Sequence, residues 1–284
     1  MCEREKIEGL AVTYLLPRLM SASFHTPHPN PLPQGARVFC LALCLFTAPC
    51  SVFAATAQEL LEQGDRLTQT DDGFPDAFTR ALTLYEQAAA LDPQNPLPYI
   101  RTARACLALG DWLGRDRLPW YERGEQSVER ALTLKEDSAE AHFLLAANRG
   151  NIVNLRPFWK VSPTVVADLE KQLQRALELD PRHARALHMM GALLDETPGP
   201  LRLLLHGRKE QVEGYLTRAV EADANRYTYI RWSLAEFYRD AGRPAQARAQ
   251  AQALLATAGS MDRRMWVEKY RPAAEALLKH LAAQ

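Results

Sequence analysis

The sequence has little of what a membrane protein, a nucleic-acid-binding protein or a disulfide-linked domain needs. Basic and acidic side chains balance at 34 each, so no excess of positive charge is available to follow a phosphate backbone. The longest uncharged apolar run, residues 38–48, is too short to cross a bilayer. Four of the five cysteines precede residue 55, which leaves Cys106 alone in the remainder. The remainder cannot form an internal disulfide, so its fold must depend on packing.

Catalytic motifs are also missing. The sequence contains no GxSxG turn, no GxxxxGK phosphate loop, no HExxH zinc motif and no CxxC pair. His183 and His188 are five residues apart, which does not match the spacing of metal ligands on one helical face. We therefore expect a protein that is not an enzyme, with no cofactor, no metal ion and no nucleic-acid partner.

The first 54 residues are not expected to belong to the fold. Residues 1–36 are rich in proline and show neither a helical nor a strand period, so we treat them as a non-native or disordered leader. Residues 37–54 have the pattern of a secretory signal peptide, with a basic residue, a short apolar core and a small-residue ending at Ala54. The sequence predicts cleavage near Ala54, and hence a periplasmic or otherwise exported protein whose folded part is residues 55–284.

Cys50 leaves a second destination open. A lipid attached to this cysteine would make the protein an outer- or inner-membrane lipoprotein. Pro49 stands directly before it, where lipoprotein signals have a small residue, so the lipid anchor is the alternative and the soluble exported form is the main prediction.

One pattern recurs along residues 55–284. Similar stretches of alternating apolar and charged residues start at Ala88, Ala131, Ala176 and Ala219, at intervals of 43 to 45 residues. Two of these stretches end in Asp-Pro, and proline stops a helix because it has no amide donor and restricts the residue before it. The stretches are therefore predicted to be the ends of repeated helices.

Small residues occupy a second repeated position. Apolar residues mostly lie four before and three after each of them, which predicts one buried stripe per helix. A small residue is needed there because the two antiparallel helices of a hairpin approach closely. The residues at this position are Gly64, Ala103, Ala146, Gly191 and Ala235.

Together these positions resemble the tetratricopeptide repeat. The most complete copy contains Leu234, Ala235, Tyr238, Gly242, Ala247 and Leu254. The resemblance covers roughly residues 57–256 and implies an all-α fold, a TPR-like α-solenoid of about five helical hairpins. A further helix near residues 266–282 would cap the open end of the stack. An unrelated helical bundle is the alternative.

The copies differ from plain repeats by insertions. The first four hairpins carry roughly 5, 9, 11 and 9 extra residues between their two helices, and the fifth carries none. We predict that these residues form long intra-hairpin turns, which stacking would place side by side along one edge of the solenoid. Insertions collected on one edge usually mark the functional face.

Aromatic residues and arginine, which are enriched at binding surfaces, concentrate in these turns. Alternatively, the aromatic side chains pack the turns onto the hairpins. His142 and Arg149 share one helix face, where they could bind an anionic ligand or hydrogen-bond a neighbouring hairpin. The three leucines at 203–205 are predicted to form a contact, because exposed leucine runs are an aggregation hazard. The candidate partner-binding residues are Trp112, Trp120, Tyr121, His142, Arg149, Arg156, Phe158, Trp159, Arg202, Leu204, His206 and Arg208.

The sequence also resembles a narrower family, the T-component proteins associated with periplasmic TRAP transporters. The resemblance lies in residues 104–121, 140–148, 175–181 and 197–209. It implies a periplasmic binding protein that contacts a solute-binding protein of the transporter or a small apolar ligand. The alternative is a scaffold for assembly of the cell envelope that self-associates, through residues 200–205.

Overall fold

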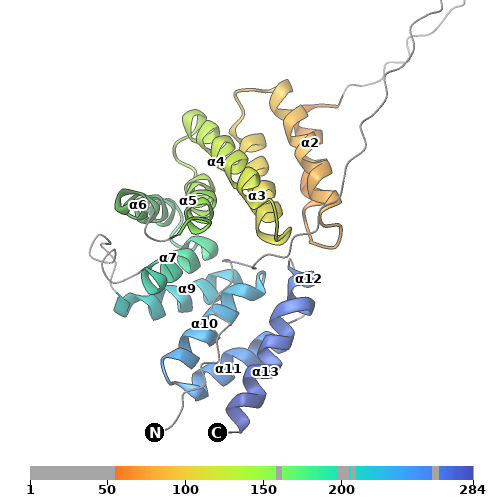
Figure 1. The fold of residues 1–284 in the computed structure, drawn as a ribbon. Helices are drawn as coiled ribbons and strands as arrows, with labels where there is room; N and C mark the ends of the chain where they lie inside the picture. Colours follow the sequence, from red (N-terminus) through yellow and green to blue (C-terminus); the bar gives the residue numbers. More distant parts are fainter. Residues whose placement is uncertain (1–54, 158–161, 198–204, 206–208, 258–261, 284) are drawn as a thin grey trace, which may run out of the picture. The chain divides into compact units, whose positions relative to one another are not determined.

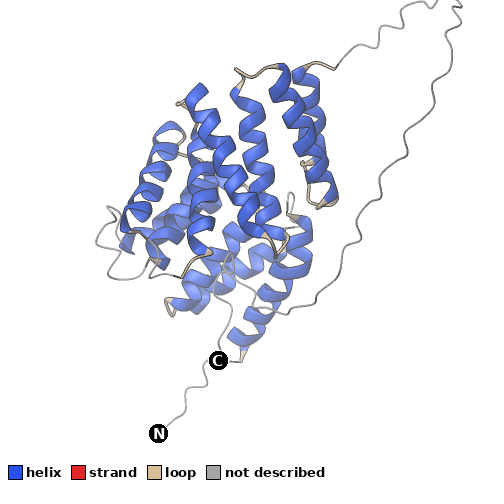
Figure 2. Cartoon of the chain, turned by 45° about the horizontal axis from the view of Figure 1, so that its top comes forward, coloured by secondary structure: helices blue, strands red, loops and turns tan. Residues whose placement is uncertain are grey.

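The computed structural model describes residues 55–157, 162–197, 205, 209–257 and 262–283. Within these residues every regular element is a helix, and no strand is present (Figure 2). The predicted leader and signal peptide, residues 1–54, lie outside the described part. None of the described helices combines the length and the apolar character that crossing a membrane requires.

The helices form five successive hairpins, as predicted (Figure 1). They are followed by a continuous helical segment made of α12 (Arg263–Met265), the π-helical turn η3 (Trp266–Tyr270) and α13 (Arg271–Ala282). A short 3-10 turn, η2 (Lys209–Gln211), precedes α9. The hairpins pair α1 (Ala57–Leu67) with α2 (Asp76–Leu91), α3 (Pro96–Trp112) with α4 (Arg117–Leu134), α5 (Ala139–Asn154) with α6 (Pro163–Leu179), α7 (Ala184–Glu196) with α9 (Val212–Asp223), and α10 (Thr228–Asp240) with α11 (Pro244–Leu255).

Local sequence signals set where the helices begin. The Asn95 side chain accepts a hydrogen bond from the Leu97 amide at the start of α3, and the Ser138 hydroxyl does the same for Ala141 in α5. The ring of His183 accepts from the Ala186 amide in α7. These caps satisfy amide groups that have no partner inside the helix.

The predicted small positions are close helix contacts. A Cβ atom at Gly64 would overlap the Tyr85 ring, and one at Gly191 would lie 3.0 Å from Leu216 Cδ2. The alanines at the other three small positions, and those at the predicted ends of the second helices, have no exposed surface: Ala103, Ala146, Ala235, Ala88, Ala131, Ala176 and Ala219. The repeat pattern is therefore a packing pattern, as the sequence predicted.

The second insertion differs from the prediction. It lengthens the helices instead of the turn, so that α3 runs to Trp112, α4 starts at Arg117 and only residues 113–116 connect them. Gly114 and Asp116 have positive φ values of 72° and 49°, which lets the chain reverse in this short space. Arg117 Nε donates to the Gly110 carbonyl oxygen at 2.8 Å, which satisfies a carbonyl at the end of α3.

The first helices of successive hairpins lie against one another. Helix α3 contacts α5, and α5 contacts α7. We call the side formed by the first helices of the five hairpins, α1, α3, α5, α7 and α10, the inner side. At the end of the stack, α13 packs on α11 and buries Ala274, Leu277 and Leu281, so it caps the last hairpin as predicted.

Candidate functional site

A series of ion pairs joins the first helices along the inner side. Arg101 Nε on α3 lies 2.8 Å from Asp65 Oδ1 on α1. Arg104 Nε, one turn further along α3, donates to Glu140 Oε1 on α5 at 3.0 Å. Each pair links one hairpin to the next. We call the whole set, Asp65, Arg101, Arg104, Glu140, His183 and Arg185, the inner ladder.

Glu140 is the central residue of the inner ladder. It accepts hydrogen bonds from Arg104, from Arg185 and from His183 Nε2, the last at 2.9 Å. Burial acts to raise its pKa, but Arg185, His183 and Arg104 outweigh burial and hold the pKa well below its usual range. Glu140 therefore stays ionised and ties three hairpins together.

Aromatic rings surround the far end of the inner ladder. The Arg185 guanidinium carbon lies 4.6 Å from the ring centroid of Phe143 and 5.6 Å from that of Tyr227. Tyr227 in turn lies 5.6 Å from Tyr229, and the Tyr229 ring meets His188 edge-on at 5.0 Å. Planar rings and a planar guanidinium thus stand beside one another where α5, α7 and the start of α10 meet.

A second polar cluster joins the first helices at their opposite ends. Tyr121 Oη donates to Asp111 Oδ1 at 2.8 Å, and Asn151 Nδ2 donates to the same oxygen at 2.9 Å. Arg117 donates to Tyr121 Oη. Burial raises the pKa of Asp111 to about 7, although Tyr121, Arg117, Asn151 and Arg185 oppose the rise. The cluster joins α3, α4 and α5.

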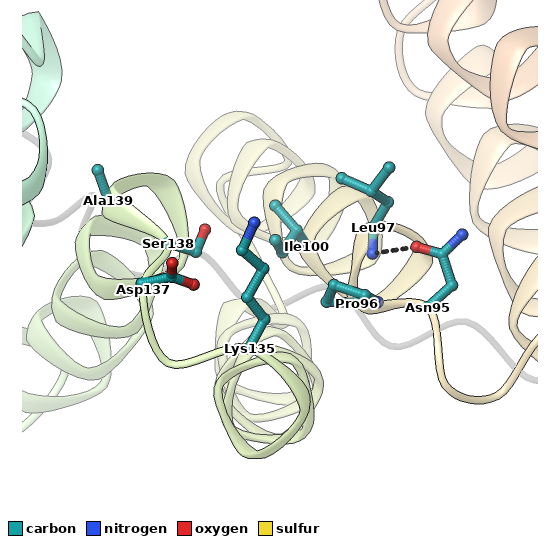
Figure 3. Close-up of a pocket in the computed structure, with 8 residues that line it drawn as sticks. All are labelled: Asn95, Pro96, Leu97, Ile100, Lys135, Asp137, Ser138 and Ala139. Carbon is teal, nitrogen blue, oxygen red and sulfur yellow. Dashed lines mark hydrogen bonds between the residues drawn. The ribbon is translucent and has the colours of Figure 1, made fainter.

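A shallow pocket of about 560 Å³ opens next to the inner ladder (Figure 3). Ile100 and Leu97 of α3 face Lys135, at the end of α4, and Ser138, at the start of α5. Leu97 is 43% exposed, whereas Ile100 is buried. The pocket therefore offers a small apolar surface beside a charged side chain, and Ile100 directly precedes the ladder residue Arg101.

The described aromatic residues that were predicted as partner-binding lie in packed positions. Trp112 meets the Phe74 and Phe78 rings edge-on, at centroid distances of 5.2 and 5.6 Å, and Trp120 packs against the same cluster. Tyr121 has no exposed surface. For Tyr121 the prediction of a partner contact is wrong, because its ring fills the space beside Gly110 and its hydroxyl is bonded inside the cluster just described.

The two polar candidates on α5 contact neighbouring helices. His142 Nδ1 lies 2.8 Å from Gln172 Oε1 of α6, and Nε2 lies 2.8 Å from the Glu136 carbonyl oxygen. Arg149 pairs with Glu125, Glu129 and Asp168, which come from α4 and α6. Of the two interpretations left open, contact with the neighbouring hairpin is the one that the geometry shows. An anion-binding role for either residue stays a prediction.

The remaining candidates are placed less fully. Arg156 is exposed just after α5. Leu205, one of the three leucines predicted to form a contact, is buried in the main core, so this leucine is covered by the chain itself. Phe158, Trp159, Arg202, Leu204, His206 and Arg208 lie outside the described residues, so their predicted role is neither supported nor contradicted. The described residues contain no group of metal-ligating side chains that could hold an ion.

Sequence reasoning missed the inner ladder itself. Glu140 and Arg185 occupy the same position, the second residue of a first helix, in successive hairpins. Opposite charges one repeat apart are the signal that could have found them. Tyr227 and Phe143 carried no such signal, because aromatic residues near a helix start usually serve the core.

Comparisons with known proteins give the fold. The crystal structure of TTC0263, a thermophilic TPR protein from Thermus thermophilus, matches with a TM-score of 0.59 at 20% identity and covers 79% of this chain and 100% of its own. YrrB, described as a TPR protein with an unusual peptide-binding site, gives a TM-score of 0.42 at 16% identity over 80% of this chain and 92% of its own. The fold assignment depends on the first of these.

Sequence comparisons reach less far. The family described as Regulator of microtubule dynamics protein 1-3 matches residues 60–194, from α1 to α7, which is less than half of the chain. No curated protein matches. The repeats, their packing and the TTC0263 likeness agree, and the described part of the chain is an all-α solenoid with the tetratricopeptide-repeat fold.

Proposed function

We propose that the protein is a binding module whose inner side holds a segment of another protein. The observation that carries the proposal is the position of the Arg185 guanidinium at the end of the inner ladder, close to the buried Phe143 ring and to the half-buried Tyr227 ring. Arginine and aromatic rings fixed in place are the combination most enriched at the centres of protein interfaces. A solenoid also offers such groups along a continuous surface, which suits an extended or helical peptide.

The inner ladder would contribute orientation more than affinity. Its charges already have partners, so a peptide gains little by pairing with them. Arg104 is one of the two most exposed members of the ladder, since 40% of its side chain is accessible beside Glu140, as is 41% of the Asp65 side chain. Arg104 can donate to a peptide carbonyl or carboxylate without leaving Glu140, because a guanidinium has five N–H donors.

We further propose that the protein is exported and acts beside a transporter. The signal-peptide pattern of residues 37–54 supports export. The resemblance to the T-component proteins supports a solute-binding protein of a TRAP-type transporter as the partner, with a small apolar ligand as the other candidate. Both proposals come from the sequence. The inner side is where we expect such a partner to bind.

A matched pair of arginine variants tests the binding proposal. Arg104→Ala removes an arginine–glutamate pair on the inner side, and Arg123→Ala removes a comparable pair with Glu86 between the outer helices α4 and α2. Tagged protein is used to capture partners from periplasmic extract, and the captured proteins are identified by mass spectrometry. We expect one partner to be retained by the wild type and by Arg123→Ala, and to be at least tenfold depleted with Arg104→Ala.

The melting temperature separates binding from folding in this experiment. Both variants should melt within about 3 °C of the wild type, because the exposed Arg123–Glu86 pair contributes about 0 to 1 kcal/mol and Glu140 keeps Arg185 and His183 as partners when Arg104 is removed. If both variants lose the partner equally, or if Arg104→Ala captures as much partner as the wild type, the inner side is not the binding surface.

Self-association is the second candidate function, and two exposed leucines favour it. Leu91 at the end of α2 is 58% exposed, and Leu97 at the start of α3 is 43% exposed beside the pocket of Figure 3. If the protein is a self-assembling scaffold, Leu97→Ser should convert an oligomer into a monomer in sedimentation velocity. A monomeric wild type at cellular concentrations contradicts this candidate.

A further inference from the structure

The beginning of the last helical segment contacts the first hairpin, almost 200 residues earlier in the chain. Asp71, in the turn between α1 and α2, accepts hydrogen bonds from the Arg264 amide, at 2.9 Å from Oδ2 and 3.1 Å from Oδ1. Its Oδ2 atom also lies 3.4 Å from the Met265 amide. The Arg264 guanidinium carbon lies 5.2 Å above the Phe74 ring. Figure 1 shows α12 beneath the turn that leads into α2.

This contact departs from the usual organisation of repeat proteins. In a solenoid each repeat contacts its neighbours in sequence, so the first and last repeats remain apart. Here a side chain that is only 1% exposed, Asp71, is buried by residues that follow the fifth hairpin. The buried carboxylate is satisfied by backbone amides, as a buried charge must be.

The same short segment is anchored to the last hairpin. Asp262 Oδ2 accepts from the amide of Thr228, the first residue of α10, at 2.8 Å, and from its hydroxyl at 2.6 Å. Asp262 is 2% exposed. Residues 262–265 therefore connect the start of α10 to the turn between α1 and α2, and close the series of hairpins upon itself.

The two attachments differ in extent. The last segment holds to hairpin 5 through Asp262 and through the buried face of α13, which packs on α11. The part of its contact with hairpin 1 that the structure details consists of one carboxylate, two amides and one guanidinium over a ring. Local openings in proteins occur where few buried contacts must be broken. The contact with hairpin 1 is therefore the weaker of the two.

The segment also faces the inner side. Lys269 of η3 feels the charges of Asp111 on α3 and Glu236 on α10, both of which oppose the lowering of its pKa by burial. Helix η3 contacts α10 directly. A chain segment that runs from α10 to hairpin 1 and contacts α10 lies beside the inner side.

We propose that residues 262–282 are an internal latch, which holds the first and last hairpins together through Asp71 and restricts access to the inner side. The latch opens at the Asp71 contact while α13 stays on α11. Its effect on a partner depends on the proposed binding function, because a peptide on the inner side then competes with closure. The latch itself does not depend on that function.

Hydrogen exchange of the full-length protein with two neighbouring aspartate variants tests the latch. Asp71→Ala removes the acceptor of the Arg264 and Met265 amides. Asp72→Ala is the matched control, because Asp72 is exposed and its carboxylate bonds only the nearby Thr70 hydroxyl at 3.2 Å. We expect Asp71→Ala to speed exchange in residues 262–270 and 68–75 about tenfold, with no change in α4 to α6. Asp72→Ala should leave all segments unchanged.

Two results would overturn the latch. Exchange in residues 262–270 that is unaltered by Asp71→Ala would mean that the contact does not hold the segment. Faster exchange throughout α4 to α6, with a matching drop in melting temperature, would mean that Asp71 supports the whole fold and does not control a local opening. Arg264→Ala, with exposed Arg263→Ala as its control, tests the other part of the contact, because it removes the guanidinium over Phe74 and keeps the backbone amide that Asp71 accepts.

Binding measurements then separate the latch from the proposed function. If a partner peptide has been captured, Asp71→Ala should bind it several-fold more tightly than Asp72→Ala does, because no closure must be undone. Unchanged affinity despite local opening would restrict the latch to a structural closure and overturn its control of access. Failure of any peptide to bind either variant would count against the binding function and leave the exchange result standing.

Discussion

Among single residues, His188 shows most clearly how burial changes the pKa of a side chain. It is buried between α7 and α10, where its Nε2 lies 2.8 Å from the Ser233 hydroxyl. Burial lowers its pKa from 6.5 to about 4. The unfolded chain therefore binds a proton near pH 6.5 that the folded protein does not accept until about pH 4.

The first prediction concerns acid stability. Between pH 6.5 and 4 the unfolded state binds more protons at His188, so the fold loses stability as the pH falls. Relative to His188→Gln, the wild type should lose up to about 3 kcal/mol between pH 7 and pH 4. Urea denaturation at each pH measures this difference. A difference in stability between the wild type and His188→Gln that does not change with pH would contradict the assignment.

Other residues were predictable because local rules fix them. Gly64 and Gly191 could be recognised as close contacts, since only a small residue fits where two helices meet. Glu140 and Arg185 carry a weaker signal, because opposite charges at the same repeat position suggest a pair, but their partners are 36 to 45 residues away and only the stacking of the hairpins decides whether they meet. Long-range ion pairs depend on how hairpins stack, which a periodic pattern leaves open.

Among the elements, the second hairpin shows where sequence reasoning about length fails. The number of inserted residues was readable, but their conformation was not. Gly110 lies within α3, and Pro119 lies in the first turn of α4, where proline is tolerated, so the helices continue until Gly114 and Asp116 reverse the chain. Because the helices are longer, Asp111, Tyr121 and Asn151 can meet, and that cluster was also missed.

Two glycines allow a second prediction, in which the same substitution by alanine changes the stability in opposite directions. Gly114 has a φ of 72°, so Gly114→Ala should destabilise the protein by about 1 kcal/mol even though no atom lies within 4 Å of the new methyl group. Gly214 is exposed within α9, with a helical φ and equally open surroundings, so Gly214→Ala should stabilise by up to about 1 kcal/mol. Urea midpoints measure both. Changes of equal sign would contradict the turn geometry of the second hairpin.

At the scale of the whole molecule, closure changes how a local defect spreads. Leu277 lies in the buried contact between α13 and the last hairpin. In an open solenoid a defect there would loosen α11 and α13 and decay along the stack. In this protein the same helical segment contacts the first hairpin, so a defect near Leu277 can also loosen the first hairpin.

The third prediction follows from this contact with the first hairpin. Leu277→Ala should cost about 2 to 4 kcal/mol, because it leaves a cavity in a packed contact. Hydrogen exchange should rise in α11 and α13 and also in residues 68–75 of the first hairpin, more than in α5. Phe78→Leu provides the comparison in the opposite direction, because this change weakens the first hairpin, and hydrogen exchange is then compared in α11 and α13. A defect that stops at α11 would mean that the ends of the stack are independent.

The buried thiol of Cys106 can report on opening of the repeat stack. Its side chain has no exposed surface, and burial raises its pKa to about 12, so the reactive thiolate is scarce in the native state. No other cysteine occurs after residue 54. Thiol-specific labelling of that part of the chain therefore counts how often α3 leaves its neighbours, without any engineered reporter.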